Sequence, residues 1–192
     1  MRDQEKLEAQ VSELLEELGY VIDSDMHLRE TPRRVASWLL EATENGHGRS
    51  TYDILDGKIW DGGEPGELIV QNQIFFSSLC AHHLMPFWGY TTIGYVVGEN
   101  AGVGRVVGLS KLARVVRQES KGLQIQEDLT HNLLSVLEVA LQPEWLGIMV
   151  EATHSCMAFR GARAHEANTA TILTSGETTA SNLAMFQMQC GR

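Results

Sequence analysis

The chain has 192 residues, enough for one domain with a substantial core, and 43% of them are hydrophobic, as in ordinary globular proteins. Its 25 acidic and 15 basic residues give a formal net charge of −10, which argues against nonspecific binding to nucleic acid or to anionic membranes but allows a local basic pocket. The chain has no run of 18 apolar residues, a charged N-terminus and only three cysteines, so we expect a reducing cytoplasm and no membrane span.

The first 50 residues are predicted to form a helical extension. Apolar residues at helical spacing over residues 5–18 predict an amphipathic helix with acidic residues opposite. A second helix is expected to begin at Thr31, a suitable N-cap, with Pro32 at the first helical position. Residues 45–66 are rich in glycine and aspartate and are expected to form a long connection.

From Glu67 onward the pattern is that of strands and helices. Residues 67–79 and 87–97 are β-branched and aromatic between turn residues, which predicts two strands. A short strand then leads into a helix that begins at Leu109 or Ser110. The helix that follows it carries four leucines in register: Leu129, Leu133, Leu137 and Leu141. Two further strands are expected over residues 145–159 and 167–175, and then a short polar tail with the free thiol of Cys190.

This order of elements predicts an α+β fold. We expect an antiparallel four-stranded sheet with two helices packed on one face, preceded by the N-terminal helical extension. The corresponding regions are residues 1–50, which are helical, and residues 51–192, which carry the sheet.

Two cysteine and histidine clusters predict a metal site. Cys80 and His83 have C-x-x-H spacing, and His154 and Cys156 would point to the same side of a continuous strand. Thiolate and imidazole ligands together suit zinc. With His82 there are five candidates, of which three would suffice and leave a position for water, as catalytic zinc requires. The alternatives are hydrogen-bonded histidines beside small buried cysteines, or a purely structural zinc with four ligands.

Basic residues at a predicted helix start indicate an anion site. Ser110, Lys111 and Arg114 begin the helix after residue 108, and the two cations share one face. Free N–H groups and cations at a helix N-terminus bind anions, and Arg160 would face the metal pair if its strand continued. A solvated basic surface explains the same residues.

A Gln-Glu pair opens the next predicted helix. Glu127 could accept two N–H bonds from the Watson–Crick edge of guanine, and Gln126 lies beside it. A carboxylate in the first turn of a helix is equally explained by the helix dipole.

Several of these motifs together resemble one family. "CAHHLMPFWG", "VGLSKLARVV", "LQIQEDLT" and "HSCMAFRG" occur in the order and approximate spacing of the type I GTP cyclohydrolases, which have the tunnelling fold. "ETPRRVASWL" is similar to the N-terminal helix of that family. The resemblance covers roughly residues 30 to 175.

The resemblance implies a zinc-dependent reaction on GTP. Zinc on Cys80, His83 and Cys156 would activate a water that attacks C8 of guanine and opens the imidazole ring. His82 and His154 would act as general acid and base. Formate would leave, and a pterin ring would close to give 7,8-dihydroneopterin triphosphate.

The resemblance also implies the substrate contacts and the assembly. It assigns the guanine to Gln126 and Glu127, the ribose region to Ser110, and the triphosphate to Lys111, Arg114, Arg160 and Arg34. Arg34 would come from a neighbouring subunit, because sites in this family form at subunit contacts. Bacterial-type members are decamers of two pentamers, in which the sheets join into a barrel.

Some positions depart from the family pattern. Ala81 stands where a glutamate is usual, Ser37 where a basic residue is usual, and Gly122 where an arginine is usual, although Lys121 is adjacent. The loop over residues 98–105 is a few residues longer than usual. A divergent member is therefore a second hypothesis: one with another purine nucleotide or phosphate preference, one that stops after ring opening, or one that binds nucleotide or pterin without turnover.

Overall fold

The structure is a computed structural model that describes residues 3–43, 50–100, 103–177 and 179–190. It divides into two compact units, Met1–Glu44 and Asn45–Arg192. Residues 45–49 of the predicted connection and residues 101–102 of the predicted longer loop lie outside the described residues. Among the described residues, no helix combines the length and hydropathy needed to cross a bilayer.

The N-terminal unit consists of two α-helices joined through a short 3-10 turn. They are α1 (Gln4–Glu17) and α2 (Thr31–Ala42), with η1 (Ile22–Ser24) between them. Both predicted helices are therefore present, but the N-cap of α2 is Glu30 rather than Thr31, and no side chain caps it. The amide of Gln4 donates to Ser37 Oγ at 3.0 Å and joins the two helices.

The C-terminal unit is built on a five-stranded sheet. Its strands are β2 (Leu68–Cys80), β3 (Pro86–Val96), β6 (Leu123–Gln124), β7 (Trp145–His154) and β8 (Thr169–Gly176), in the order β6-β2-β3-β7-β8. The four long strands are antiparallel neighbours, and β6 adds a short parallel pairing to β2. A smaller sheet has the order β1-β5-β4 and consists of β1 (Ile59–Asp61), β4 (Glu99–Asn100) and β5 (Val103–Val107). The predicted α+β class is confirmed.

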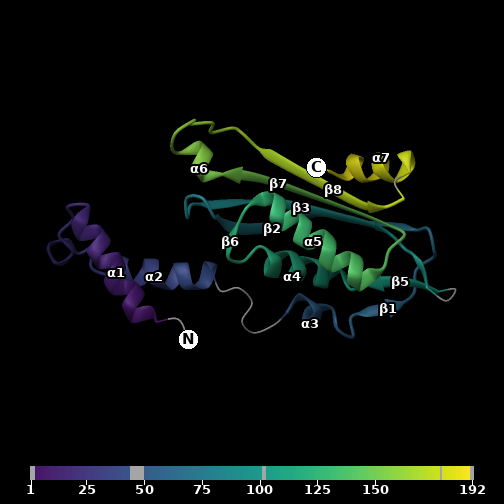
Figure 1. Cartoon of the computed structure of the whole chain (residues 1–192), viewed down its shortest axis with the longest axis horizontal. Coiled ribbons are helices and arrows are strands. Elements are labelled where there is room, and N and C mark those ends of the chain that lie inside the picture. Colours follow the sequence, from purple (N-terminus) through teal and green to yellow (C-terminus); the bar gives the residue numbers. More distant parts are fainter. Residues whose placement is uncertain (1–2, 44–49, 101–102, 178, 191–192) are drawn as a thin grey trace. The chain divides into compact units, whose positions relative to one another are not determined.

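Two helices cover one face of the large sheet, as predicted. They are α4 (Leu109–Glu119) and α5 (Gln126–Leu141), and their apolar sides join the main core with the inward residues of β2, β3 and β7 (Figure 1). The four predicted leucines of α5 are each at most 1% exposed. The prediction of a long connection before the sheet missed two short elements in it: α3 (Thr51–Leu55), which a reciprocal Ser50–Asp53 capping box stabilises, and β1.

The predicted polar tail is wrong, because it forms helix α7 (Ala180–Gln189). This helix packs on the opposite face of the sheet from α4 and α5 (Figure 1). Phe186 is fully buried there with Val96 and Met149, and its ring meets that of Trp145 edge-on at 5.6 Å. A single aromatic anchor therefore fixes a helix whose other apolar residues are largely exposed.

Phe186→Ala is expected to lower the free energy of unfolding by about 3 to 5 kcal/mol, because it removes a fully buried ring and leaves a cavity against Trp145. Met188→Ala on the same helix is the matched control, since Met188 is 63% exposed. Urea unfolding followed by tryptophan fluorescence measures both variants. Equal midpoints for the two variants would contradict the packing described for α7.

Candidate active site

Cys80 ends β2 and begins a tight turn back to β3. The Cys80 N–H donates to the Met85 carbonyl, and the Leu84 N–H donates to the Cys80 carbonyl, both at 2.9 Å. Strand β6 pairs Gln124 with Cys80, and the Ala81 N–H donates to the Gln124 carbonyl at 3.0 Å. Since α5 begins two residues after Gln124, this pairing brings the N-terminus of α5 to the turn.

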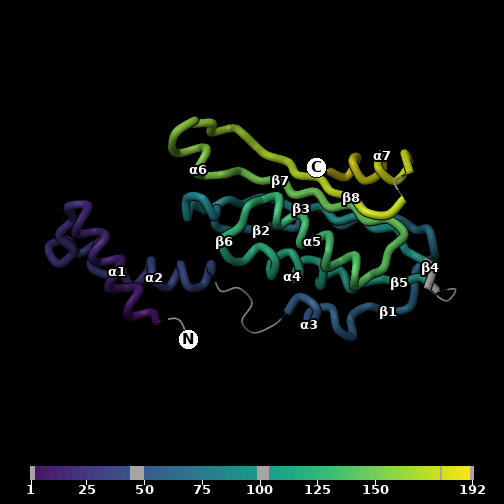
Figure 2. Tube along the Cα trace, in the orientation of Figure 1, coloured from purple at the N-terminus to yellow at the C-terminus, as the bar shows by residue number. Residues whose placement is uncertain are grey.

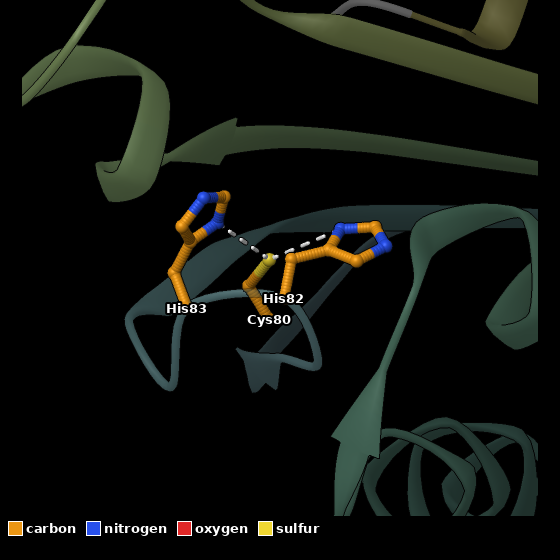
Figure 3. A group of neighbouring side chains, drawn as sticks. All are labelled: Cys80, His82 and His83. Carbon is orange, nitrogen blue, oxygen red and sulfur yellow. Dashed lines mark hydrogen bonds between the residues drawn. The ribbon is translucent and has the colours of Figure 1, made fainter.

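Within this turn, two imidazoles face one thiol. The Nδ1 atoms of His83 and His82 lie 3.7 Å and 3.9 Å from Cys80 Sγ, and both rings turn toward the sulfur (Figure 3). Cys80 is 5% exposed, while both histidines are exposed. These three residues form a group that could hold a metal ion. The two distances are so similar that the choice of His83 as ligand and His82 as proton carrier stays a prediction.

Cys156 approaches Cys80 from a short helix and not from the predicted strand. The expected strand over residues 145–159 is wrong beyond His154, because Ser155–Ala158 form the short helix α6. The Ser155 hydroxyl donates to the Pro86 carbonyl and turns the chain there. Residues 154, 156 and 160 therefore do not share one strand face, but α6 still places Cys156 Sγ 3.9 Å from Cys80 Sγ.

The donor set suits a tetrahedral metal ion. Two sulfur ligands at about 2.3 Å from a tetrahedral ion lie roughly 3.8 Å apart, close to the observed separation of the two thiols. A sulfur and a nitrogen ligand of such an ion lie roughly 3.6 Å apart, close to the distance from Cys80 Sγ to His83 Nδ1. Both separations from Cys80 therefore fit the implied metal, while the ligand atoms that all lie within 4.8 Å of one another are those of Cys80, His82 and His83, without Cys156.

Arg160 contacts the outer nitrogen of His83. Its Nη1 lies 2.6 Å from His83 Nε2, and since a guanidinium only donates, Nε2 accepts. A neutral His83 then carries its proton on Nδ1, so binding a metal through Nδ1 requires Arg160 to leave Nε2. Burial and the adjacent Cys80 thiol raise the pKa of Cys156, and the charge of Arg160 opposes that rise.

His154 is held by contacts on its face and on its edge. Its ring stacks on the fully buried Phe87 at 4.6 Å with 3° between the planes, as cross-strand partners in β7 and β3. Its Nε2 lies 2.8 Å from Gln126 Oε1. Burial lowers the pKa of His154, and the carboxylate of Glu127 opposes that effect. The neutral imidazole is thus favoured beside an exposed carboxylate.

The predicted phosphate residues are not all near this group. Ser110 and Lys111 begin α4, which runs from β5 to β6, and only the β6 end adjoins Cys80 (Figures 1 and 2). Ten residues of helix separate the two ends by about 15 Å. Arg114 follows one turn after Ser110 and is exposed, and Arg34 is exposed on α2 of the N-terminal unit. Among the predicted phosphate residues described in the C-terminal unit, Arg160 contacts the group directly, through His83.

The structure also places the positions that depart from the family pattern. Ala81 is exposed in the turn, and Ser37 accepts the hydrogen bond from Gln4. Gly122 has φ +93°, a left-handed conformation that favours glycine over arginine. Its carbonyl accepts a hydrogen bond from Ser78 Oγ at 3.4 Å, so the tight turn between α4 and β6 explains this departure.

Sequence analysis missed Phe87 as a site residue. Its contact with His154 depends on the register of β3 against β7, which pairs residues 67 positions apart and leaves no local signal. The Pro-Phe dipeptide after the histidines was the only available hint.

Fold and site together define a mixed α+β protein with a cysteine and histidine group suited to a metal. Comparison with known proteins identifies the family more closely: the chain belongs to the GTP cyclohydrolase I family, whose family model matches residues 7–189. The predicted family and fold class are thereby confirmed.

Individual relatives agree with this assignment. The chain is 40% identical to GTP cyclohydrolase 1 of Streptococcus suis (strain 05ZYH33) over 92% of this chain and 90% of the relative. It is also 40% identical to that of Streptococcus gordonii over the same shares, and 41% identical to that of Gloeobacter violaceus over 70% of this chain and 59% of the relative. Among solved structures, the apo form of the archaeosine synthase QueF-Like has a TM-score of 0.45 at 15% identity, over 61% of this chain and 100% of that chain, which is too distant to be informative.

Proposed function

We propose that this chain is a zinc-dependent GTP cyclohydrolase I, which opens the guanine imidazole ring, releases formate and forms 7,8-dihydroneopterin triphosphate. The observation that carries the proposal is the convergence of two thiols, two imidazoles and the His154–Gln126 contact, contributed by three segments distant in sequence. Membership of the GTP cyclohydrolase I family supports the substrate.

The proposal gives each residue of the centre a task. Cys80, His83 and Cys156 would hold the zinc, which when bound supplies an activated water for hydrolysis at C8. His154 is a fixed, neutral imidazole that can take up and return a proton at Nδ1. His82, exposed beside the thiols, is the second proton carrier. Glu127 is close enough to His154 to influence its pKa and would accept the N–H bonds of the guanine edge.

The phosphate residues support a site shared between subunits. Ser110 and Lys111 lie at the far end of α4 from β6, the strand that pairs with Cys80, so we take an identical neighbour as the source of these residues and of Arg34. Strand β8 has one sheet neighbour within the described residues, which leaves its other edge for pairing. The N-terminal unit exposes large apolar side chains, including Leu14 at 58% and Leu18 at 64%. We therefore propose a homodecamer of two pentamers with joined sheets, in a reducing cytoplasm that keeps both thiols free.

His154→Asn tests whether this centre turns substrate over or only binds it. The variant is expected to keep its affinity for GTP within about threefold, while formate release falls on the order of 10³-fold because a proton carrier is lost. Calorimetry measures binding, and a coupled formate assay measures turnover. His131→Asn, on the exposed side of α5, is the control and should match the parent. If the parent protein bound GTP without releasing formate, the alternative hypothesis would be correct, namely a family member that binds nucleotide without turnover.

A further inference from the structure

We propose that Gln126 is a positioning residue that fixes the tautomer of His154, rather than a group that binds guanine. Gln126 is the first residue of α5 and is only 2% exposed. A substrate would have little access to an amide buried at this depth. The importance of Gln126 for catalysis rests on the proposed function, but the hydrogen bonds that orient its amide do not.

The amide of Gln126 is oriented by the backbone. Its Nε2 donates to the Val150 carbonyl on β7 and to the Thr169 carbonyl on β8, both at 2.9 Å. Carbonyl oxygens only accept, so a flipped amide would place its oxygen against both of them. Both N–H groups are therefore used by the sheet, and Oε1 has to point toward His154.

This orientation determines which nitrogen of His154 carries the proton. Gln126 Oε1 only accepts, so His154 Nε2, at 2.8 Å, must be the protonated nitrogen. The lone pair of the neutral ring is then on Nδ1. The stacked Phe87 ring prevents the imidazole from turning out of this plane. The carbonyls of two strands thus fix the orientation of the Gln126 amide, and this amide in turn fixes which nitrogen of His154 is free to react.

A chemically similar residue provides the control. Gln124 lies two positions earlier and also uses its Nε2 to donate to two carbonyls, those of Glu119 and Lys121, each at 3.0 Å. Gln124→Met therefore removes two amide-to-carbonyl bonds, as Gln126→Met does, but it removes no contact with His154. Gln126→Glu keeps an acceptor for His154 Nε2, but it replaces the two donors with an oxygen that faces the Val150 and Thr169 carbonyls.

The test combines magic-angle-spinning NMR of histidine-labelled, zinc-loaded protein with steady-state kinetics on GTP. A His154→Gln spectrum assigns the signals of His154. We expect the Nε2–H tautomer in the parent, in Gln124→Met and in Gln126→Glu, and a mixture of tautomers in Gln126→Met. For Gln126→Met we also expect kcat to fall about 10- to 100-fold with KM changed less than about twofold.

Two results would overturn the inference. One is an unchanged Nε2–H tautomer in Gln126→Met, which would show that Gln126 does not set it. The other is a large rise in KM with kcat preserved, which would return Gln126 to guanine binding. If the parent released no formate, the proposed function would fail, while the tautomer measurement would still decide the role of Gln126.

Discussion

Cys156→Ala is expected to abolish both metal retention and formate release. Cys156 Sγ lies 3.9 Å from Cys80 Sγ, and this pair provides both sulfur donors of the site. Because His82 is assigned as the proton carrier, losing one of them leaves Cys80 and His83 as ligands, and two ligands are too few for a tight tetrahedral site with an open position. Because a metal ion contributes several kcal/mol of transition-state stabilisation, we expect the rate to fall by roughly 10⁴-fold.

Cys190→Ala is the matched control for this experiment. Its thiol is the third free cysteine, half-buried at the end of α7, where it donates to the Phe186 carbonyl at 3.2 Å. Metal content by mass spectrometry and formate release should both match the parent. A folded Cys156→Ala protein with full metal content and rate would contradict the assignment of Cys156. Unfolding of Cys156→Ala with loss of metal would instead indicate a structural zinc.

Gly89→Ala is expected to lower the free energy of unfolding by about 3 kcal/mol or more. A Cβ at this position would lie 1.8 Å from the Glu151 carbonyl oxygen and 2.8 Å from Ala152 Cα, both backbone atoms that cannot move without separating β3 from β7. Gly89 pairs with Ala152, two positions from the Phe87–His154 pair. The substitution should therefore also disturb the stacked imidazole.

Gly62→Ala is the control, because its Cβ would have its nearest neighbour, Val106 Cγ2, at 3.7 Å, an ordinary contact. Thermal and urea unfolding compare the two variants. A Gly89→Ala protein as stable as Gly62→Ala would show that the close approach of β3 and β7 is not as described.

Local patterns predicted most of the large elements. The long strands and α5 have periodic, strongly apolar sequences, so their positions could be predicted to within a few residues. Helix α6 could not, because the apolar run through Phe159 is interrupted by a bond between Ser155 and Pro86, 69 positions away. Helix α7 was missed because it depends on one buried ring against Trp145 rather than on a periodic face.

The sequence allowed the residues of the site to be predicted, but not the contacts that they make with one another. The thiols and histidines were recognisable because two of three cysteines lie beside histidines. The role of Gln126 was not, since it depends on carbonyls of β7 and β8 that lie 24 and 43 residues further along the chain. Nor could the sequence show that Ser110 and Lys111 begin α4 at the end remote from Cys80.

The most direct test of the central claim is mass spectrometry of zinc-loaded protein incubated separately with GTP, dGTP, GDP and GMP. The proposed function predicts one formate released per GTP, together with dihydroneopterin triphosphate. A ring-opened nucleotide without ring closure would place a block after the first hydrolysis. All four nucleotides recovered unchanged from protein with zinc bound would contradict the proposed cyclohydrolase activity.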